Sequence, residues 1–271
     1  MTSFFLTPTR KISSNVFGDL IDSICIYSYH FDKPMLIDLD GRPEGVFELV
    51  FQKESDIWQS SVIGDDWQLR DQAFIAGLHQ SSYKLRIFPD TKIISVRFKP
   101  GGFKYFNPEK QDNFSNKRIC ISEIWGLKGK KLIERISNEE DENTKISIII
   151  NFLHENYNGE RKSIIDNLVR VIIKNDGIVD LKKLADSCNL SVTHLRKVFR
   201  EEIGLSPKKF SKIIKVNSIL KKVVYAKEKR DLMNLAHSFH YYDQSHFIKD
   251  FKEIVGYKPT EYCDLVRKSG Y

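Results

Sequence analysis

The apolar positions of the 271-residue chain follow two different periods. Up to residue 118 they form short runs that alternate with polar residues, as in Ile21–Tyr29 and Val46–Phe51, and Gly, Asp and Pro separate the runs. Strands at such spacing are typical of an all-β sandwich or barrel. We therefore predict a β-rich N-terminal domain over residues 1–118. Its remaining strands are predicted at Met35–Leu39, Trp67–Leu69, Ala73–Leu78, Tyr83–Phe88 and Ile93–Phe98.

Residues 119–160 change to the helical period, in which apolar residues recur every three or four positions. Packing on the β-rich domain is the simpler interpretation of their apolar stripe, and packing on a second subunit, as in a homodimer, is the alternative. We predict a helical connector that ends in a linker at Asn158–Lys162. The stripe comprises Ile121, Ile124, Trp125, Leu132, Ile133 and Ile136.

Residues 161–271 contain one pattern twice. Each copy has a short helix, a tight turn, and a second helix that begins at Ser or Asp, passes a Phe and ends at a Gly. The first copy, called the first head, covers Asp180–Phe210, and the second head covers Asp231–Pro259. This order of signals predicts a helix-turn-helix in each head. The matching positions are Ala185 and Ala236, Ser191 and Asp243, Phe199 and Phe251, Gly204 and Gly256, and Pro207 and Pro259.

A long helix from Lys208 to about Tyr225 is predicted between the two heads. Its length would be about 26 Å at the α-helical rise, compared with about 34 Å for one turn of DNA. Two heads tied by such a spacer would enter successive major grooves. A further helix starts near Ser163 and stops at Asp176-Gly177, where an αL turn is expected. The C-terminal domain should therefore be all-α with about seven helices, and the whole chain of the α+β class.

The net charge of +7 is unevenly distributed. Residues 161–271 hold 23 Lys and Arg against 13 Asp and Glu, a net of +10, whereas residues 1–160 have a net of −3. This segregation predicts a polyanionic partner for the C-terminal domain. The chain has no apolar run of about 18 residues, so no membrane partner and a cytoplasmic location are expected. Four scattered Cys without a CxxC pair suggest neither a disulfide framework nor a zinc site.

The second helix of each head has a free face opposite its apolar face. Arg, Lys, Gln, Ser and Thr on these faces are the side chains that pair with base edges or phosphates in a major groove. A merely solvated polar face would explain one copy as well, but two copies with the same signals disfavour it. Candidate phosphate contacts are Lys182, Lys183, Arg200, Lys208, Lys209 and Lys252.

The repeated motif, the spacer helix and the segment DQSHFIKDFKEIVGYKP resemble the DNA-binding domain of AraC/XylS-type bacterial transcription regulators. The resemblance covers about residues 163–266. It implies that the second helix of each head reads bases, and that His194 and His246 are structural residues on the buried side. The chain departs from the family at Asn189 and His240, where Gly is usual. The implied base-reading residues are Thr193, Arg196 and Lys197 in the first head and Gln244, Ser245, Ile248 and Lys249 in the second.

The N-terminal half resembles a β-rich domain found in one branch of these regulators, through the segments PEGVFELVFQ, ISVRFKPGGF and ISEIWG. This resemblance implies a role in sensing a small molecule or in dimerisation, without naming the ligand. The expected partners are thus double-stranded DNA, RNA polymerase, and a small-molecule effector or a second copy of the chain. The expected activity is that of a sequence-specific transcription regulator, either an activator or a repressor.

Two other functions were weighed against regulation. An enzyme with a DNA-binding appendage would need a catalytic motif, and the sequence contains no nucleophile elbow, phosphate loop or HExxH. A cupin-like metal site at His30, His79, Glu44 and Glu48 lacks the tight His-x-His pattern of such sites, so no metal or other cofactor is expected. A non-specific architectural DNA binder is the third hypothesis, although a large β domain is surplus to that role.

Overall fold

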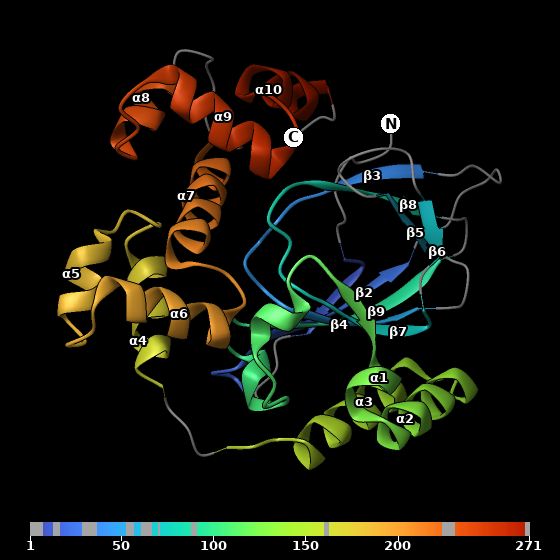
Figure 1. Cartoon of the computed structure of the whole chain (residues 1–271). Coiled ribbons are helices and arrows are strands. Elements are labelled where there is room, and N and C mark those ends of the chain that lie inside the picture. The colour runs from blue at the N-terminus through green and yellow to red at the C-terminus, as the bar shows by residue number, and fades with distance from the viewer. Residues whose placement is uncertain are drawn as a thin grey trace.

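The structure is a computed structural model that describes residues 8–12, 17–28, 37–52, 57–60, 67–69, 71–87, 91–159, 163–223 and 231–268. A β-rich domain lies beside a helical C-terminal domain (Figure 1). The α+β class and the order of its parts are as predicted. Several predicted positions fall outside the described residues, namely Tyr29, His30, Met35, Phe88, Tyr225 and residues 160–162 of the linker.

Two antiparallel sheets form the N-terminal domain in the described part of the chain. The six-stranded sheet has the order β1 (Arg10–Ile12), β2 (Ile21–Ser28), β9 (Lys92–Phe98), β4 (Glu48–Gln52), β7 (Ala73–Ala76) and β10 (Arg118–Cys120). The four-stranded sheet has the order β3 (Ile37–Gly41), β8 (Tyr83–Ile87), β5 (Ile57–Ser60) and β6 (Trp67–Leu69). Strands β1, β5 and β10, of three or four residues each, were not predicted.

Both faces of the six-stranded sheet are covered. On one face Leu49 and Val96 are completely buried in the large core. On the other face Val50, Phe74 and Ile93 form a smaller cluster with Leu85 of β8, which places this cluster between the two sheets. Because a strand turns successive side chains to opposite faces, two covered faces leave β4 with an almost continuous apolar run instead of strict alternation.

Short helices lie against the first face. They are η1 (Phe103–Tyr105), η2 (Gln111–Phe114), α1 (Ile121–Trp125), α2 (Leu127–Asn138) and α3 (Glu142–Glu155). The connector helices pack on the β domain, as the simpler interpretation predicted, since Ile121 and Leu132 are buried in the common core. Trp125 packs edge-on against Phe152 of α3, with ring centroids 5.2 Å apart. Strand β10 extends the sheet two residues past the predicted domain limit at residue 118.

Seven helices form the described C-terminal domain, as expected. They are α4 (Ile164–Lys174), α5 (Leu181–Asp186), α6 (Val192–Ile203), α7 (Pro207–Val223), α8 (Asp231–Ser238), α9 (Gln244–Val255) and α10 (Pro259–Lys268). The spacer helix α7 stands between the α5–α6 pair and the α8–α9 pair (Figure 1). Helix α4 ends as predicted, because Asp176 and Gly177 both have positive φ and Gly177 N–H donates to Ile172 O.

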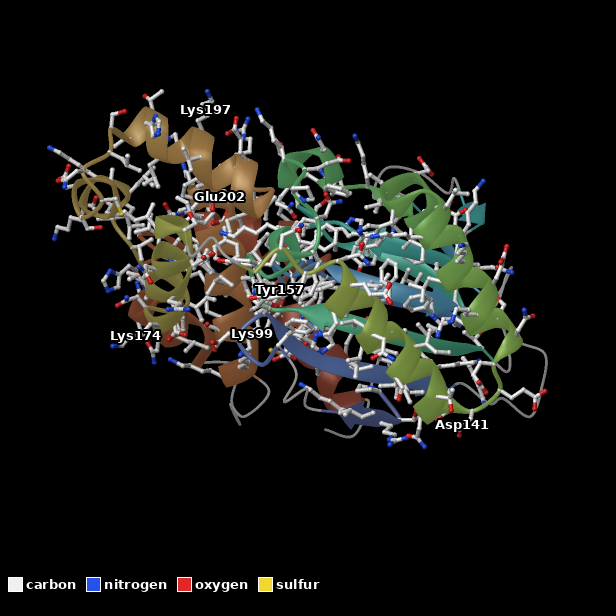
Figure 2. All side chains as sticks on the ribbon, turned by 90° about the horizontal axis from the view of Figure 1, so that it is seen from below. Lys99, Asp141, Tyr157, Lys174, Lys197 and Glu202 are labelled. Atoms are coloured by element: carbon white, nitrogen blue, oxygen red, sulfur yellow. The ribbon has the colours of Figure 1, made fainter. Side chains whose placement is uncertain are left out.

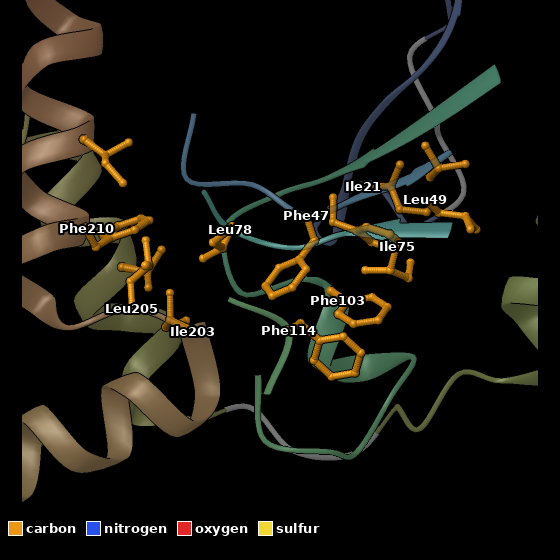
Figure 3. Close-up of a cluster of buried hydrophobic side chains, with 14 of the residues drawn as sticks. Ile21, Phe47, Leu49, Ile75, Leu78, Phe103, Phe114, Ile203, Leu205 and Phe210 are labelled. Carbon is orange, nitrogen blue, oxygen red and sulfur yellow. The ribbon is translucent and has the colours of Figure 1, made fainter. Parts of the chain in front are cut away.

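The two domains share one continuous hydrophobic core. Figure 3 shows Phe47, Phe103 and Phe114 of the β domain on one side and Ile203, Leu205 and Phe210 of the C-terminal domain on the other. All six of these side chains are at most 3 % exposed. Ion pairs surround this contact: Lys104 with Asp166 (2.6 Å) and Glu202 (2.7 Å), and Lys110 with Glu201 (2.9 Å).

Candidate nucleic-acid interface and a cavity in the β domain

The first head is built by local signals that its sequence carries. Asp180 caps helix α5, and its carboxylate accepts from the backbone N–H of Lys182 and Lys183. The turn passes through Asn189 at φ 55°, and Ser191 caps α6 by accepting from the backbone N–H of His194. Ser and Asp at such positions satisfy N–H groups that have no partner inside the helix. The helix-turn-helix predicted here is therefore present.

One face of α6 is buried and the other is free. Leu195 and Phe199 have no exposed surface, whereas Thr193, Arg196 and Lys197 are exposed. In Figure 2, Lys197 lies on the outer side of α6 and Glu202 on the side toward the rest of the molecule. The phosphate-contact candidates Lys182, Lys183, Arg200 and Lys208 are exposed as well.

The second head has the same kinds of cap and turn, formed by different residues. His240 takes the αL position of the turn at φ 57°, and Asp243 caps α9 by accepting from the backbone N–H of His246 at 2.7 Å. Helix α9 ends at Gly256 with φ 91°, as α6 ends at Gly204 with φ 90°. The structure places the base-reading candidates Gln244, Ser245 and Lys249 at the surface together with Lys252, and half-buries Ile248.

Two histidines are not where the resemblance implied. His194 and His246 are exposed, and 56 % of the His246 side chain is accessible. The buried positions belong to the next residues, Leu195 and Phe247. The expectation of a buried-side role was wrong because each histidine lies only three residues after the helix cap, on the free side of the first turn.

Lys209 also differs from the other candidate phosphate contacts. Its side chain is only 14 % exposed, and its ammonium pairs with Glu253 of α9. Lys212 of α7 lies 2.6 Å from Asp250 and 3.1 Å from Glu253. Lys209 therefore helps to join the second head to α7, and it is not one of the exposed basic residues of the heads.

Asp250 is the centre of this join and was missed as a functional residue. Its side chain is 8 % exposed, and His246 Nε2 lies 3.4 Å from its second oxygen. Burial raises the pKa of Glu253, but hydrogen bonds from Lys209 and Lys212 outweigh that effect and hold the pKa below its usual value. The signal in the sequence was a lone carboxylate on the apolar face of α9, where a buried charge needs a partner.

A cavity opens between the two sheets of the β domain. Its wall includes the loop Arg42–Val46 and side chains of both sheets, among them Glu48, Arg97 and Leu85. Arg97 pairs with Glu44 and lies 3.1 Å from Glu48. Burial opposes ionisation of Glu44, but the Arg97 guanidinium outweighs it and lowers the pKa of Glu44.

This cavity collects several residues of the rejected metal hypothesis. His79, Glu44 and Glu48 all line it, and His79 is distant in the sequence from the two glutamates. Within the described ranges, no group of three or more His, Cys, Asp or Glu is placed to hold a metal ion. Arg97 was not among the predicted site residues, and only the sheet register reveals that it points into the cavity with Glu48.

The geometry of the two heads agrees with comparisons to known proteins. Residues 184–264, which cover most of both heads, match the family model of a helix-turn-helix domain, and the recurrence of its signals in both heads is the AraC arrangement. The C-terminal domain is an AraC-type helix-turn-helix domain. Residues 23–120 match a second family, described as a domain of unknown function (DUF6597). No curated protein matches the chain significantly.

Among solved structures, the chain with its AraC-type domain is similar to ToxT of Vibrio cholerae. An apo form of ToxT from strain SCE256, which carries a single substitution, has a TM-score of 0.47 at 10 % identity, covering 95 % of this chain and 100 % of that one. ToxT of strain O395 has a TM-score of 0.44 at 12 % identity, covering 92 % and 99 %. The AraC-like transcriptional activator CuxR has a TM-score of 0.26 at 12 % identity, covering 78 % and 84 %.

The AraC-type domain supports the assignment of the protein as a DNA-binding transcription regulator. No helix within the described ranges has the length and apolar character needed to cross a membrane.

Proposed function

We propose that the protein recognises a specific DNA sequence by placing its two heads in successive major grooves. The observation that carries this proposal is the duplication itself: both heads have the same caps, turns and exposed polar faces, and a single helix joins them. Helix α7 has 17 residues, so it is about 26 Å long. That length suits two reading helices one turn of DNA apart, a spacing of about 34 Å.

The proposed contacts divide by function. Phosphate contacts give affinity that depends on salt, whereas side chains at base edges give sequence preference. Lys209 is left out of the phosphate set because of its ion pair with Glu253. The base-reading set is Thr193, Arg196, Lys197, Gln244, Ser245, Ile248 and Lys249, and the phosphate set is Lys182, Lys183, Arg200, Lys208 and Lys252.

The test begins with selection of bound DNA fragments from the source genome, which should return one shared site with two motifs about one helical turn apart. On that site Arg196→Ala should cost about 1–3 kcal/mol and relax the preference at one base position. Arg170→Ala, at an exposed position of α4 outside both heads, is the matched control. Equal affinity for random duplexes would instead support the architectural alternative, and an unchanged preference in R196A would refute the base-reading assignment.

We further propose that the N-terminal domain senses a small molecule in its cavity. The loop Arg42–Val46 supports this, because it lines the cavity and also contacts the spacer helix: Asn217 Nδ2 donates to Pro43 O at 2.8 Å. Gly45 lies against Phe210, so closely that a Cβ at Gly45 would be 3.1 Å from the ring. A ligand that shifts this loop would thereby reach the helix that sets the distance between the heads.

Two further partners belong to this proposal. A regulator of this kind would activate transcription through RNA polymerase, and a second copy of the chain could join through the connector, where Leu127 is 75 % exposed. Transcription in a purified system with and without the bound site tests the first. Sedimentation of the full chain across concentration tests the second, and a monomer at all concentrations would refute it.

A further inference from the structure

One wall of the cavity is a row of charged residues set by the sheet register. Arg118 of β10 pairs with Ala76 of β7, Ala76 with Glu48 of β4, and Glu48 with Arg97 of β9. Directly opposed residues in antiparallel strands turn their side chains to the same face. Four neighbouring strands therefore present Arg118, Glu48 and Arg97 to the cavity at one level, with only the small Ala76 between Arg118 and Glu48.

The wall becomes apolar and then polar again along the strands. Two residues further along β4, Val50 pairs with Phe74, and two further still, Gln52 pairs with Ile93. A strand rises about 3.3 Å per residue, so the Gln52 level lies about 13 Å from the Glu48 level. The cavity thus offers a charged end, an apolar middle and a polar far end.

The charges at the near end are not all compensated. Arg97 is paired with both Glu44 and Glu48, and Arg42 lies 3.5 Å from Glu44. Arg118 has no carboxylate partner within the residues that the structure describes, and its guanidinium lies over the Tyr83 ring at 5.1 Å. Among the described residues that line this end, Arg118 is therefore the cation whose charge a bound anion would balance.

The far end holds a buried acceptor without a donor. Gln52 is 8 % exposed, its Nε2 donates to Asp71 O at 3.1 Å, and its Oε1 has no partner within the described ranges. A buried polar atom left unpaired costs about 1–3 kcal/mol. A donor on a bound molecule would remove that cost.

We propose that the cavity binds a small amphipathic organic acid. Its carboxylate pairs with Arg118, its apolar body lies over Val50 and Phe74, and a hydroxyl or amide N–H at its far end donates to Gln52. A cationic ligand is disfavoured because Arg97 already engages both Glu44 and Glu48. This inference rests on the proposed sensing function, and it adds the chemical class of the ligand and the two residues that select it.

The test uses three matched probes in calorimetric titrations of the full chain. They are 3-(4-hydroxyphenyl)propanoate, its amide, which lacks the charge, and 3-phenylpropanoate, which lacks the hydroxyl. The hydroxy acid should bind about tenfold more tightly than either of the others, which corresponds to about 1.4 kcal/mol for each lost contact. Equal affinity for acid and amide, or no binding of any probe at millimolar concentration, would overturn the proposal.

Two variants control for each other. Arg118→Gln should abolish the preference for acid over amide and keep the preference for the hydroxyl, and Gln52→Leu should do the reverse. A variant that loses both preferences indicates a deformed cavity, and loss of both in both variants overturns the residue assignment. DNA affinity, measured separately with and without the probe, isolates the sensing function: probe binding that leaves DNA affinity unchanged refutes sensing and retains the ligand class.

Discussion

The two heads have the same backbone plan but are joined to helix α7 by different contacts. In the first head, Val198 occupies the apolar position before Phe199, and in the second head Asp250 occupies the same position before Phe251. The second head is consequently joined to α7 by ion pairs with Lys212 and Lys209. The first head instead packs Phe199 against Phe210 of α7, with ring centroids 5.7 Å apart. The ends of both heads also touch the β domain, where Ser115 donates to Gly204 O and Ser82 N–H donates to Glu253 O.

The comparison distinguishes the residues that form a helix-turn-helix from the residues that attach it to the rest of the protein. Caps, turns and a buried Phe recur in both heads because they form each helix pair. The residues that attach each pair to its neighbour are free to differ. Both heads should therefore follow movements of α7 and of the β domain, but the second head does so through ion pairs with α7 and the first through an aromatic contact with it.

The largest loss of stability is expected from substitution of the buried Phe that both heads share. Phe199→Ala and Phe251→Ala each remove a completely buried ring, so each should lower the free energy of unfolding by about 3–5 kcal/mol. Chemical denaturation measures both, with the exposed Thr193→Ala as the control for substitution itself. A loss in only one of the two variants would show that the cores of the heads are not equivalent.

A somewhat smaller loss of stability is expected at Asp250, the position where the two heads differ. Asp250→Ala leaves Lys212 without its closest carboxylate, and removing one partner of a buried pair costs about 3 kcal/mol. The double variant Asp250→Leu with Lys212→Met gives the second head an apolar join like that of the first. The free energy of unfolding of this double variant should lie within about 1.5 kcal/mol of the wild-type value. Failure to recover would mean that the ion pairs fix a geometry that apolar packing cannot.

The basic faces of the two heads should contribute equally to the salt dependence of DNA affinity, although their base-reading residues differ. Arg200→Ala and Lys252→Ala should each reduce the slope of log affinity against log salt by about 0.9, because each removes one phosphate contact. Fluorescence anisotropy on the selected site measures the slope across salt concentrations. Lys128→Ala, on the exposed face of the connector, should leave it unchanged. A slope that changes for the variant of only one head would indicate that only that head contacts the DNA phosphates.

The smallest effect is expected in the turns. A side chain in the αL region costs energy that glycine avoids, and Asn tolerates that region better than His. His240→Gly should therefore stabilise the protein by about 0.5 kcal/mol, and Asn189→Gly should change little. Thermal unfolding of the two variants side by side measures the contrast. Destabilisation by H240G would show that the exposed imidazole makes a contact worth more than the strain.

The sequence predicted best those features that depend on neighbours along the chain. The caps at Ser191 and Asp243, the αL turns at Asn189 and His240, and both helix-ending glycines need only a few consecutive residues. Strands β1 and β10 were not predicted, whereas the equally short β6 was, because Gly64-Asp65-Asp66 marks a turn before it in the sequence. His194 and His246 were misplaced because the resemblance fixed their position in the motif but not the direction of the side chain.

The candidate sites were predictable to unequal degrees for the same reason. The exposed faces of α6 and α9 follow from helical periodicity. The cavity does not, because it depends on the pairing of Arg118 with Ala76 and of Glu48 with Arg97, across separations of 42 and 49 positions. Nothing local in a sequence specifies such a register. Likewise, the pairing of Asp250 with Lys212 needed the placement of α7 against α9.

The continuous core between the domains has a consequence for how the chain can be divided. Ile203 lies against Gly101 and Phe210 against Gly45 of the β domain, so a fragment cut in the linker would expose part of an apolar, aggregation-prone surface. During synthesis the β domain leaves the ribosome first and would wait with its side toward Ile203 and Phe210 uncovered. Folding of this regulator should therefore be completed late, when the last helices arrive, and a truncated product should be recognised as unfolded.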